Sequence, residues 1–278
     1  MTPLISIIIP CYNHGLFLDD AINSARRTGF EDIFEIIVIN DGSTDAYTLQ
    51  KLAAFAANGI TVLDQPNQGL AHARNNGIMH SSGQYILPLD ADNKIRPEVF
   101  IKAAEILQAD PDITVVYTDV QYFGNNTHKR SVGEFNILQL IDWNYIDACS
   151  LISKKAIVRA GFYDPVMPAM GHEDWDLWIT IASQAGKFYY LQEVGYDYRV
   201  VSDSMSFITT GPGTLQNKEY LFRKHASYIG VCYKRLLEQY NEGLIILSAC
   251  ASGEIGENLK NDNYEEAKRI ASWYKSVF

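Results

Sequence analysis

The chain has 278 residues, 47% of them hydrophobic and 20% charged, so it can bury a sizeable core in one large domain or two small ones. Its formal net charge of -10 leaves no general basic field for a nucleic-acid backbone, which argues against DNA or RNA as a partner. The four cysteines are scattered and form no Cys-x-x-Cys pair, so neither a zinc site nor a disulfide framework is indicated, and we expect a cytoplasmic location.

From residue 4 to about residue 117, short β-branched runs alternate with longer segments of helical period, a pattern typical of parallel strands joined by crossover helices. The predicted strands are residues 4–9, 34–39, 60–63, 85–89 and 113–117. The predicted helices are residues 16–27, 44–57, 70–80 and 97–107. An open sheet of this kind binds ligands at the carboxyl ends of its strands.

The second half of the chain is less regular. A loop is expected at residues 125–127, and beyond Gly213 long helical patterns run from Leu215 to about Tyr240 and from Tyr264 to Val277. We therefore predict a Rossmann-like α/β domain over residues 1–213 and a helical extension over residues 214–278. No apolar stretch reaches about 18 residues, so no membrane span is predicted. Basic residues of the extension leave open a solvated face or peripheral contact with the inner face of a membrane, and its Tyr-rich face leaves open a homodimer.

Polar clusters follow three of the predicted strands, at Cys11–Gly15, Asn40–Asp45 and Asp90–Asn93. In a parallel sheet these clusters face one edge, although Asn, Asp, Gly and Ser also suit any strand-to-helix turn. Asp90 and Asp92 stand two positions apart in an extended segment, so both carboxylates can address one site. Oxygen ligands of this kind suit Mg²⁺ or Mn²⁺ beside a diphosphate, and the alternative is a solvated acidic turn or helix N-cap.

The chain resembles the large family 2 of inverting glycosyltransferases, which have the GT-A fold. The resemblance covers roughly residues 4–206 and rests on five segments in the order of that family, and together they are specific: Ser6–Asn13, Glu35–Asp45, Asn67–Gly77, Gly83–Asp92 and Glu173–Trp178. The fold implied is a mainly parallel α/β sheet flanked by helices, followed here by the helical appendage. The activity implied is transfer of a hexose from a nucleoside diphosphate sugar to an acceptor hydroxyl, with inversion and with Mn²⁺ or Mg²⁺ as cofactor.

The resemblance also implies roles for individual residues. Nucleotide-sugar binding falls to the first strand, the second cluster, the third helix and the Asp-x-Asp pair, at positions Pro10, Tyr12, Asn13, Asp41, Arg74 and Asp90. Asp92 would hold the metal. These residue types fit such roles, since an Asp accepts from a base N–H and an Arg neutralises diphosphate charge, while the alternatives are a surface ion pair for Arg74 and a helix cap for Asn13.

The segment around Glu173 and Asp174 carries the remaining chemistry that the resemblance implies. Direct displacement at a sugar carbon needs a base for the acceptor proton, and Asp174 is the candidate, with Glu173 as an acceptor-orienting group or alternative base. Acidic residues also favour the first turn of a helix, and both readings are compatible. Trp175 and Trp178 are candidates for sugar stacking, with one of them expected in the core.

Two positions depart from the family pattern. Val201 stands where many members carry a His, so this protein either does without that side chain or uses another, such as Asp203 or Ser204. Asn93 stands where a third acid is frequent. The sequence and the resemblance thus predict a metal-dependent transferase that takes a UDP-linked donor and a carbohydrate or lipid-linked acceptor, in polysaccharide or glycolipid synthesis. The alternatives are an inactive nucleotide-sugar-binding protein and, less favoured, a nucleotidyltransferase.

Overall fold

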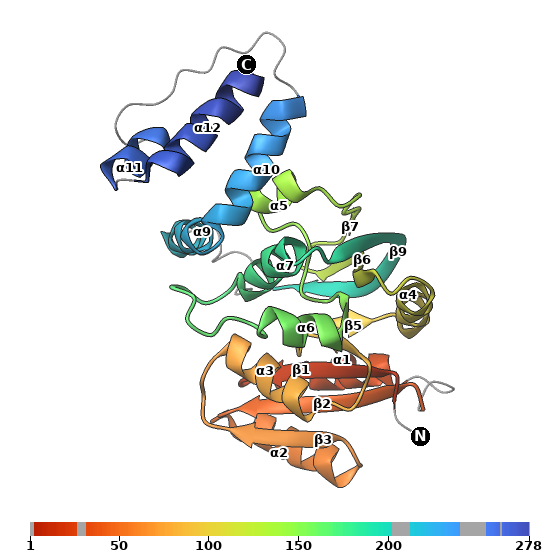
Figure 1. Ribbon diagram of the computed structural model, residues 1–278. Helices are drawn as coiled ribbons and strands as arrows, with labels where there is room; N and C mark the ends of the chain where they lie inside the picture. The colour runs from red at the N-terminus through yellow and green to blue at the C-terminus, as the bar shows by residue number, and fades with distance from the viewer. Residues whose placement is uncertain (1–2, 27–31, 202–211, 240–253, 262, 278) are drawn as a thin grey trace. The chain divides into compact units, whose positions relative to one another are not determined.

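The computed structural model describes residues 3–26, 32–201, 212–239, 254–261 and 263–277 (Figure 1). Within these ranges, nine strands form one sheet in the order β3-β2-β1-β4-β8-β6-β9-β5, with β7 paired to β6. The strands are β1 (Ile5–Cys11), β2 (Phe34–Asp41), β3 (Thr61–Gln65), β4 (Tyr85–Pro88), β5 (Lys94–Ile95), β6 (Ile113–Gly124), β7 (Lys129–Arg130), β8 (Leu151–Ser153) and β9 (Lys187–Val200).

Strands β1 to β4 form the parallel part of the sheet, as the sequence predicted. Every residue of β1 is buried because helices cover both faces of the sheet, which is usual for a central parallel strand. Ile7 and Ile9 pack into a core with Phe100, whereas Ile8 faces the opposite side, where Gly77 lies against it. The helices of this half are α1 (Leu18–Ala25), α2 (Ala46–Ala57), α3 (Leu70–His80) and α4 (Pro97–Ala109).

The half of the sheet beyond β4 is mixed. β8 runs antiparallel to both β4 and β6, whereas β6 and β9 are parallel. β6 extends to Gly124, further than the predicted strand, and the predicted loop at 125–127 follows it directly. The part of the second half that the sequence predicted to be less regular contains two short helices, α5 (Ile137–Asp142) and α6 (Lys154–Ala160), and α7 (Glu173–Ser183) follows them.

The C-terminal helices are α9 (Pro212–Lys224), α10 (Ala226–Gln239), α11 (Glu254–Lys260) and α12 (Tyr264–Val277). The single long helix predicted from Leu215 to about Tyr240 is therefore two helices. The chain divides into two compact units, residues 1–225 and 226–278, whereas the sequence suggested a boundary after residue 213. The difference is α9, whose side chains bond to the first unit. Among the described residues, no helix has the length and apolarity needed to cross a membrane.

Candidate active site

The Asp-x-Asp pair follows β4, at the carboxyl edge of the parallel strands. Burial and the neighbouring charge of Asp90 together raise the pKa of Asp92 to about 6, and the charge of His14 acts in the opposite direction. Among the described residues, no hydrogen bond from another residue reaches the Asp92 carboxylate. A cation would stabilise a partly buried carboxylate beside a second one, but among the described residues no group of three His, Cys, Asp or Glu side chains is placed to hold a metal, so a metal at Asp92 and Asp90 stays a prediction.

Arg74 joins this pair to the start of α7. It is 2% exposed on α3, and its Nη2 donates to Asp90 Oδ1 at 2.9 Å while its Nη1 donates to Glu173. Burial lowers the pKa of Arg74, but the carboxylates of Glu173 and Asp90 raise it by more, so the guanidinium is held charged. Both Nη groups are thus occupied by carboxylates, and a role for Arg74 in donor binding stays a prediction.

Asp174 lies beside Glu173 in the first turn of α7, and it is half-buried. Asn144 donates to its Oδ1 at 3.0 Å, and the backbone N–H of Trp175 donates to the same atom at 2.8 Å. Burial, with the nearby charge of Glu173, raises the pKa of Asp174 to about 7. A carboxylate with this pKa takes up a proton readily near neutral pH, as a general base requires.

Asp147 is a further carboxylate at the site that sequence reasoning missed. Burial and the charge of Asp90 raise its pKa to about 6, and its own charge in turn raises the pKa of Asp174. Asp147 and Asn144 come from the stretch before β8 that has no periodic pattern, so nothing in the sequence marked them. The acidic edge of this sheet is therefore larger than the Asp-x-Asp and Glu-Asp motifs indicate.

The residues predicted to bind the nucleotide shape the loops after β1 and β2. Asp41 is 4% exposed and accepts from the backbone N–H groups of Gln68 and Gly69, both at 2.9 Å. Gly69 has φ +89° as it opens α3, which explains a glycine there, and a Cβ would meet no atom of the described residues within 4 Å. The Asp41 carboxylate thus holds the turn into the Arg74 helix, and direct contact with a base stays a prediction.

Asn13 ties the end of β1 to the loop after β2. Its Oδ1 accepts from the backbone N–H groups of Thr44 and Asp45 at 2.8 and 2.9 Å. Pro10 is buried within β1, whereas Tyr12 is 48% exposed and leaves its ring open for stacking. Of the first-strand candidates, Tyr12 and Asn13 are both exposed, whereas Pro10 is buried.

Both candidate tryptophans are core residues, whereas the sequence predicted this of one of them. Trp175 and Trp178 are 2% and 0% exposed. Their Nε1 atoms donate to the carbonyls of Leu140 and Ile146, at 2.5 and 2.9 Å. These bonds fasten α7 to the segment on both sides of Asn144, so the tryptophans support the Asn144–Asp174 contact and do not face a sugar.

Of the two departures from the family pattern, the structure gives the contacts of Asn93 but does not describe the residues named as replacements for the His at Val201. Asn93 is 1% exposed, and its Oδ1 accepts from the Arg199 backbone N–H at 2.9 Å while Arg199 Nε donates to the Asp92 carbonyl at 3.0 Å. The amide thus fastens β9 to the Asp-x-Asp turn. Val201 is the last described residue before residue 212, so the proposed replacements Asp203 and Ser204 lie outside the described residues.

An α/β sheet whose carboxyl edge carries an Asp-x-Asp turn, faced by an acidic helix start, has the architecture of the GT-A fold. The chain belongs to glycosyltransferase family 2, because the family model described as Glycosyl transferase family 2 matches residues 6–165.

A second model, described as PHP domain, matches residues 134–278. That range includes β8 and β9 of the same sheet, and within the described residues no group of three His, Cys, Asp or Glu side chains is placed to hold a metal.

Similar proteins agree with the family assignment. An uncharacterized glycosyltransferase of Rickettsia felis is 30% identical over 191 residues, 64% of this chain and 31% of the relative. A hyaluronan synthase of Pasteurella multocida is 25% identical over 229 residues, 75% of this chain and 22% of the relative. The chain thus spans about a third or less of the length of these relatives. The structure of S. aureus TarS 1-349 in complex with UDP-GlcNAc shares the fold, with a TM-score of 0.59, 15% identity, and coverage of 98% of this chain and 92% of that one.

Proposed function

We propose that this chain transfers a sugar from a UDP-linked donor to a hydroxyl of a carbohydrate acceptor, with inversion at the sugar carbon. The observation that carries the proposal is Asp174, a half-buried carboxylate with a pKa raised to about 7 beside the Arg74 ion network. Glu173 is buried and paired with Arg74, so Asp174 is the better placed of the two to receive a proton. Displacement needs such a base at the acceptor hydroxyl.

The roles of the residues follow from their contacts. Asp174 takes the proton of the acceptor hydroxyl as that oxygen attacks the sugar carbon from the face opposite the diphosphate, and UDP leaves. Asn144 keeps the base oriented by donating to its Oδ1. Arg74 holds Asp90 on the donor side and Glu173 on the acceptor side at a fixed separation, since a buried guanidinium that bridges two carboxylates has little freedom.

A divalent cation at Asp92 and Asp90 is part of the proposal. When bound, it would offset the charge that develops on the leaving diphosphate. The support is the raised pKa of Asp92, which reflects a carboxylate that burial and a like charge both destabilise. The protein side chains would hold the donor between this pair and the loops of Asp41 and Asn13.

The donor and acceptor classes are proposed from the relatives. One relative is named a hyaluronan synthase, and the TarS structure contains UDP-GlcNAc. UDP-GlcNAc is therefore the first donor to try, and an oligosaccharide of a cell-surface polysaccharide is the first acceptor. A product with the anomeric configuration opposite to that of the donor would support inversion.

The decisive experiment compares three proteins in one assay of UDP release with Mn²⁺, UDP-GlcNAc and acceptor extracts. The wild type is expected to turn over, and Asp174→Asn to lose transfer by about 10²–10⁴-fold while it binds UDP normally, since the base acts only in the chemical step. Asp92→Asn is expected to lose the Mn²⁺-dependent part of UDP affinity, measured by calorimetry. Full activity in Asp174→Asn would exclude this base, and binding without turnover by the wild type with every donor would indicate an inactive binding protein.

A further inference from the structure

The chain enters α7, the helix of Asp174, through an unusual turn. Gly171 and His172 have φ values of +91° and +67°, so two consecutive residues adopt the left-handed region directly before Glu173. For a non-glycine residue this conformation costs free energy and persists only where the surroundings hold it in place. The position of Asp174 therefore depends on whatever holds this turn.

Asn217 of α9 holds it. The side chain is 0% exposed, and its Oδ1 accepts from the Ala169 N–H at 2.9 Å. Its Nδ2 donates to the carbonyls of Ala169 and Gly171 at 3.0 and 2.9 Å and lies 3.2 Å from His172 Nδ1. One buried amide thus uses both its donor and its acceptor capacity on the residues that lead into the base helix.

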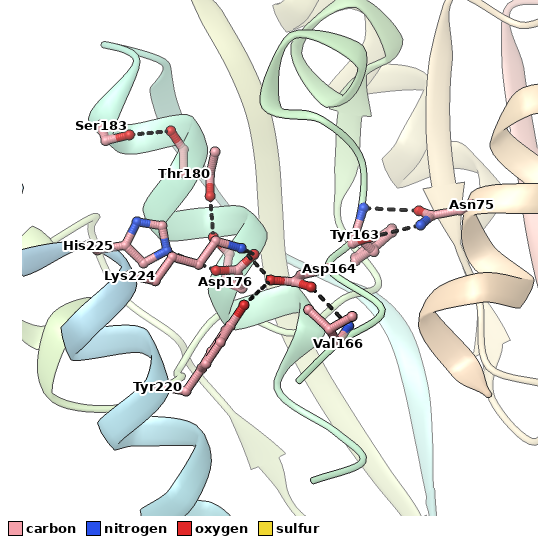
Figure 2. Close-up of polar contacts among 10 residues, drawn as sticks. All are labelled: Asn75, Tyr163, Asp164, Val166, Asp176, Thr180, Ser183, Tyr220, Lys224 and His225. Carbon is pink, nitrogen blue, oxygen red and sulfur yellow. Dashed lines mark hydrogen bonds and ion pairs between the residues drawn. The ribbon is translucent and has the colours of Figure 1, made fainter. Parts of the chain in front are cut away.

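Neighbouring side chains of α9 hold the surroundings of the same site. Lys218 donates to the carbonyl of Asp142 at 2.7 Å, two residues before Asn144, which binds Asp174. At the end of α9, Lys224 lies between the carboxylates of Asp164 and Asp176, and Asp176 is on α7 (Figure 2). α9 therefore fixes both segments that meet at Asp174.

We propose that Asn217 is a positioning residue for sugar transfer: by holding the left-handed turn at Gly171 and His172, it sets where α7 begins and hence where Asp174 meets the acceptor. This inference rests on the proposed role of Asp174 as the base. Within the described residues, the side-chain bonds of Asn217 are confined to residues 169–172 and do not reach the donor side of the site. Asn217 should therefore affect transfer and not donor binding.

The test uses the full chain with Asn217→Ser, which retains one hydroxyl donor, and Asn217→Asp, which keeps the acceptor and loses both donated bonds. Arg223→Ala on the same helix is the matched control, because Arg223 is exposed and, within the part of the chain that the structure describes, its ion pair is with Glu219, one turn earlier on the same helix. Three quantities are measured: UDP affinity by calorimetry, the single-turnover rate of transfer from UDP-GlcNAc, and amide hydrogen exchange over residues 169–176.

Both Asn217 variants are expected to bind UDP within about twofold of wild type, while transfer falls by up to about 10²-fold, the effect of a misplaced catalytic group. Amides of residues 171–176 are expected to exchange about tenfold faster, since local opening becomes easier when buried bonds are lost. Transfer by the Asn217 variants at the wild-type rate would overturn the proposal. A parallel loss of UDP affinity and transfer would also overturn it, as would failure of the milder variant Asn217→Ser to fold. If the wild type transfers no sugar, the proposed function fails, and the exchange measurement alone decides whether Asn217 holds the turn.

Discussion

The hydrogen bond from Asn144 to Asp174 offers a direct test of how the structure sets the pKa of the base. Asn144 Nδ2 donates to Asp174 Oδ1 at 3.0 Å, whereas Asn144 Oδ1 is buried and has no hydrogen-bond partner among the described residues. The side chain therefore contributes this one donated bond, which favours the charged carboxylate and lowers its pKa. In Asn144→Ala the pKa of Asp174 should rise.

The size of the change follows from the strength of the bond. A hydrogen bond to a charged group contributes about 1.5–3 kcal/mol, and a pKa shift of one unit corresponds to about 1.4 kcal/mol. Because Asp174 is half-buried and water can replace part of the lost bond, we expect its pKa to rise by roughly one unit. The pKa of Asp174 is raised to about 7 in the wild type, so about half of the base is ionised at pH 7. In the variant about one tenth would be ionised, which predicts roughly fivefold slower transfer at pH 7.

The assay is the pH dependence of kcat for sugar transfer between pH 5.5 and 9.5 with saturating donor and acceptor. The rate should rise with pH as the base ionises, and Asn144→Ala should shift this rise upward by roughly one pH unit and regain most of the wild-type rate at pH 9. Asn58→Ala is the control, because Asn58 is exposed and donates to the carbonyl of Ala54 away from the site. An inflection that stays in place or moves to lower pH would refute the reasoning.

Two further predictions concern stability. Gly77→Ala should lower the free energy of unfolding by roughly 1–2 kcal/mol in urea titrations, because the new Cβ would lie 2.5 Å from a methyl group of buried Ile8. Gly230→Ala should raise it by about 0.5–1 kcal/mol, because a Cβ on this helical residue would meet no atom of the described residues within 4 Å. Burial alone would raise the pKa of Asp119, but hydrogen bonds, led by the one from Tyr190, lower it below the unfolded value of about 3.9. The ionised carboxylate therefore stabilises the fold above about pH 3.9, and this stability is lost as the pH falls through the lower folded pKa. Asp119→Asn should therefore show a smaller fall in urea midpoint between pH 6 and pH 3 than the wild type, and an equal fall would contradict this account.

Much of the fold was predictable because local patterns and burial coincide. The apolar run of β1 is buried along its whole length, so its hydrophobicity marked it as a central strand. The helix over residues 70–80 has the predicted bounds because Gly69 begins it at φ +89°. The break at His225 between α9 and α10 was not predicted, because the helical pattern of the sequence continues through it. Tertiary bonds from Lys224 and His225 to Asp176 attach the end of α9 to the first unit.

The sequence by itself determined which chemical groups stand at the ends of the parallel strands, since the strand pattern, the turn residues and the Asp-x-Asp spacing are all local. Only the tertiary structure decided how those groups are paired. Arg74 meets Glu173 across 99 residues of sequence, and Asn144 reaches Asp174 from a stretch without periodicity. A pKa depends on burial and on neighbouring charges, and long-range folding creates both, so the ionisation of Asp174 and Asp92 could not be read from the residues alone.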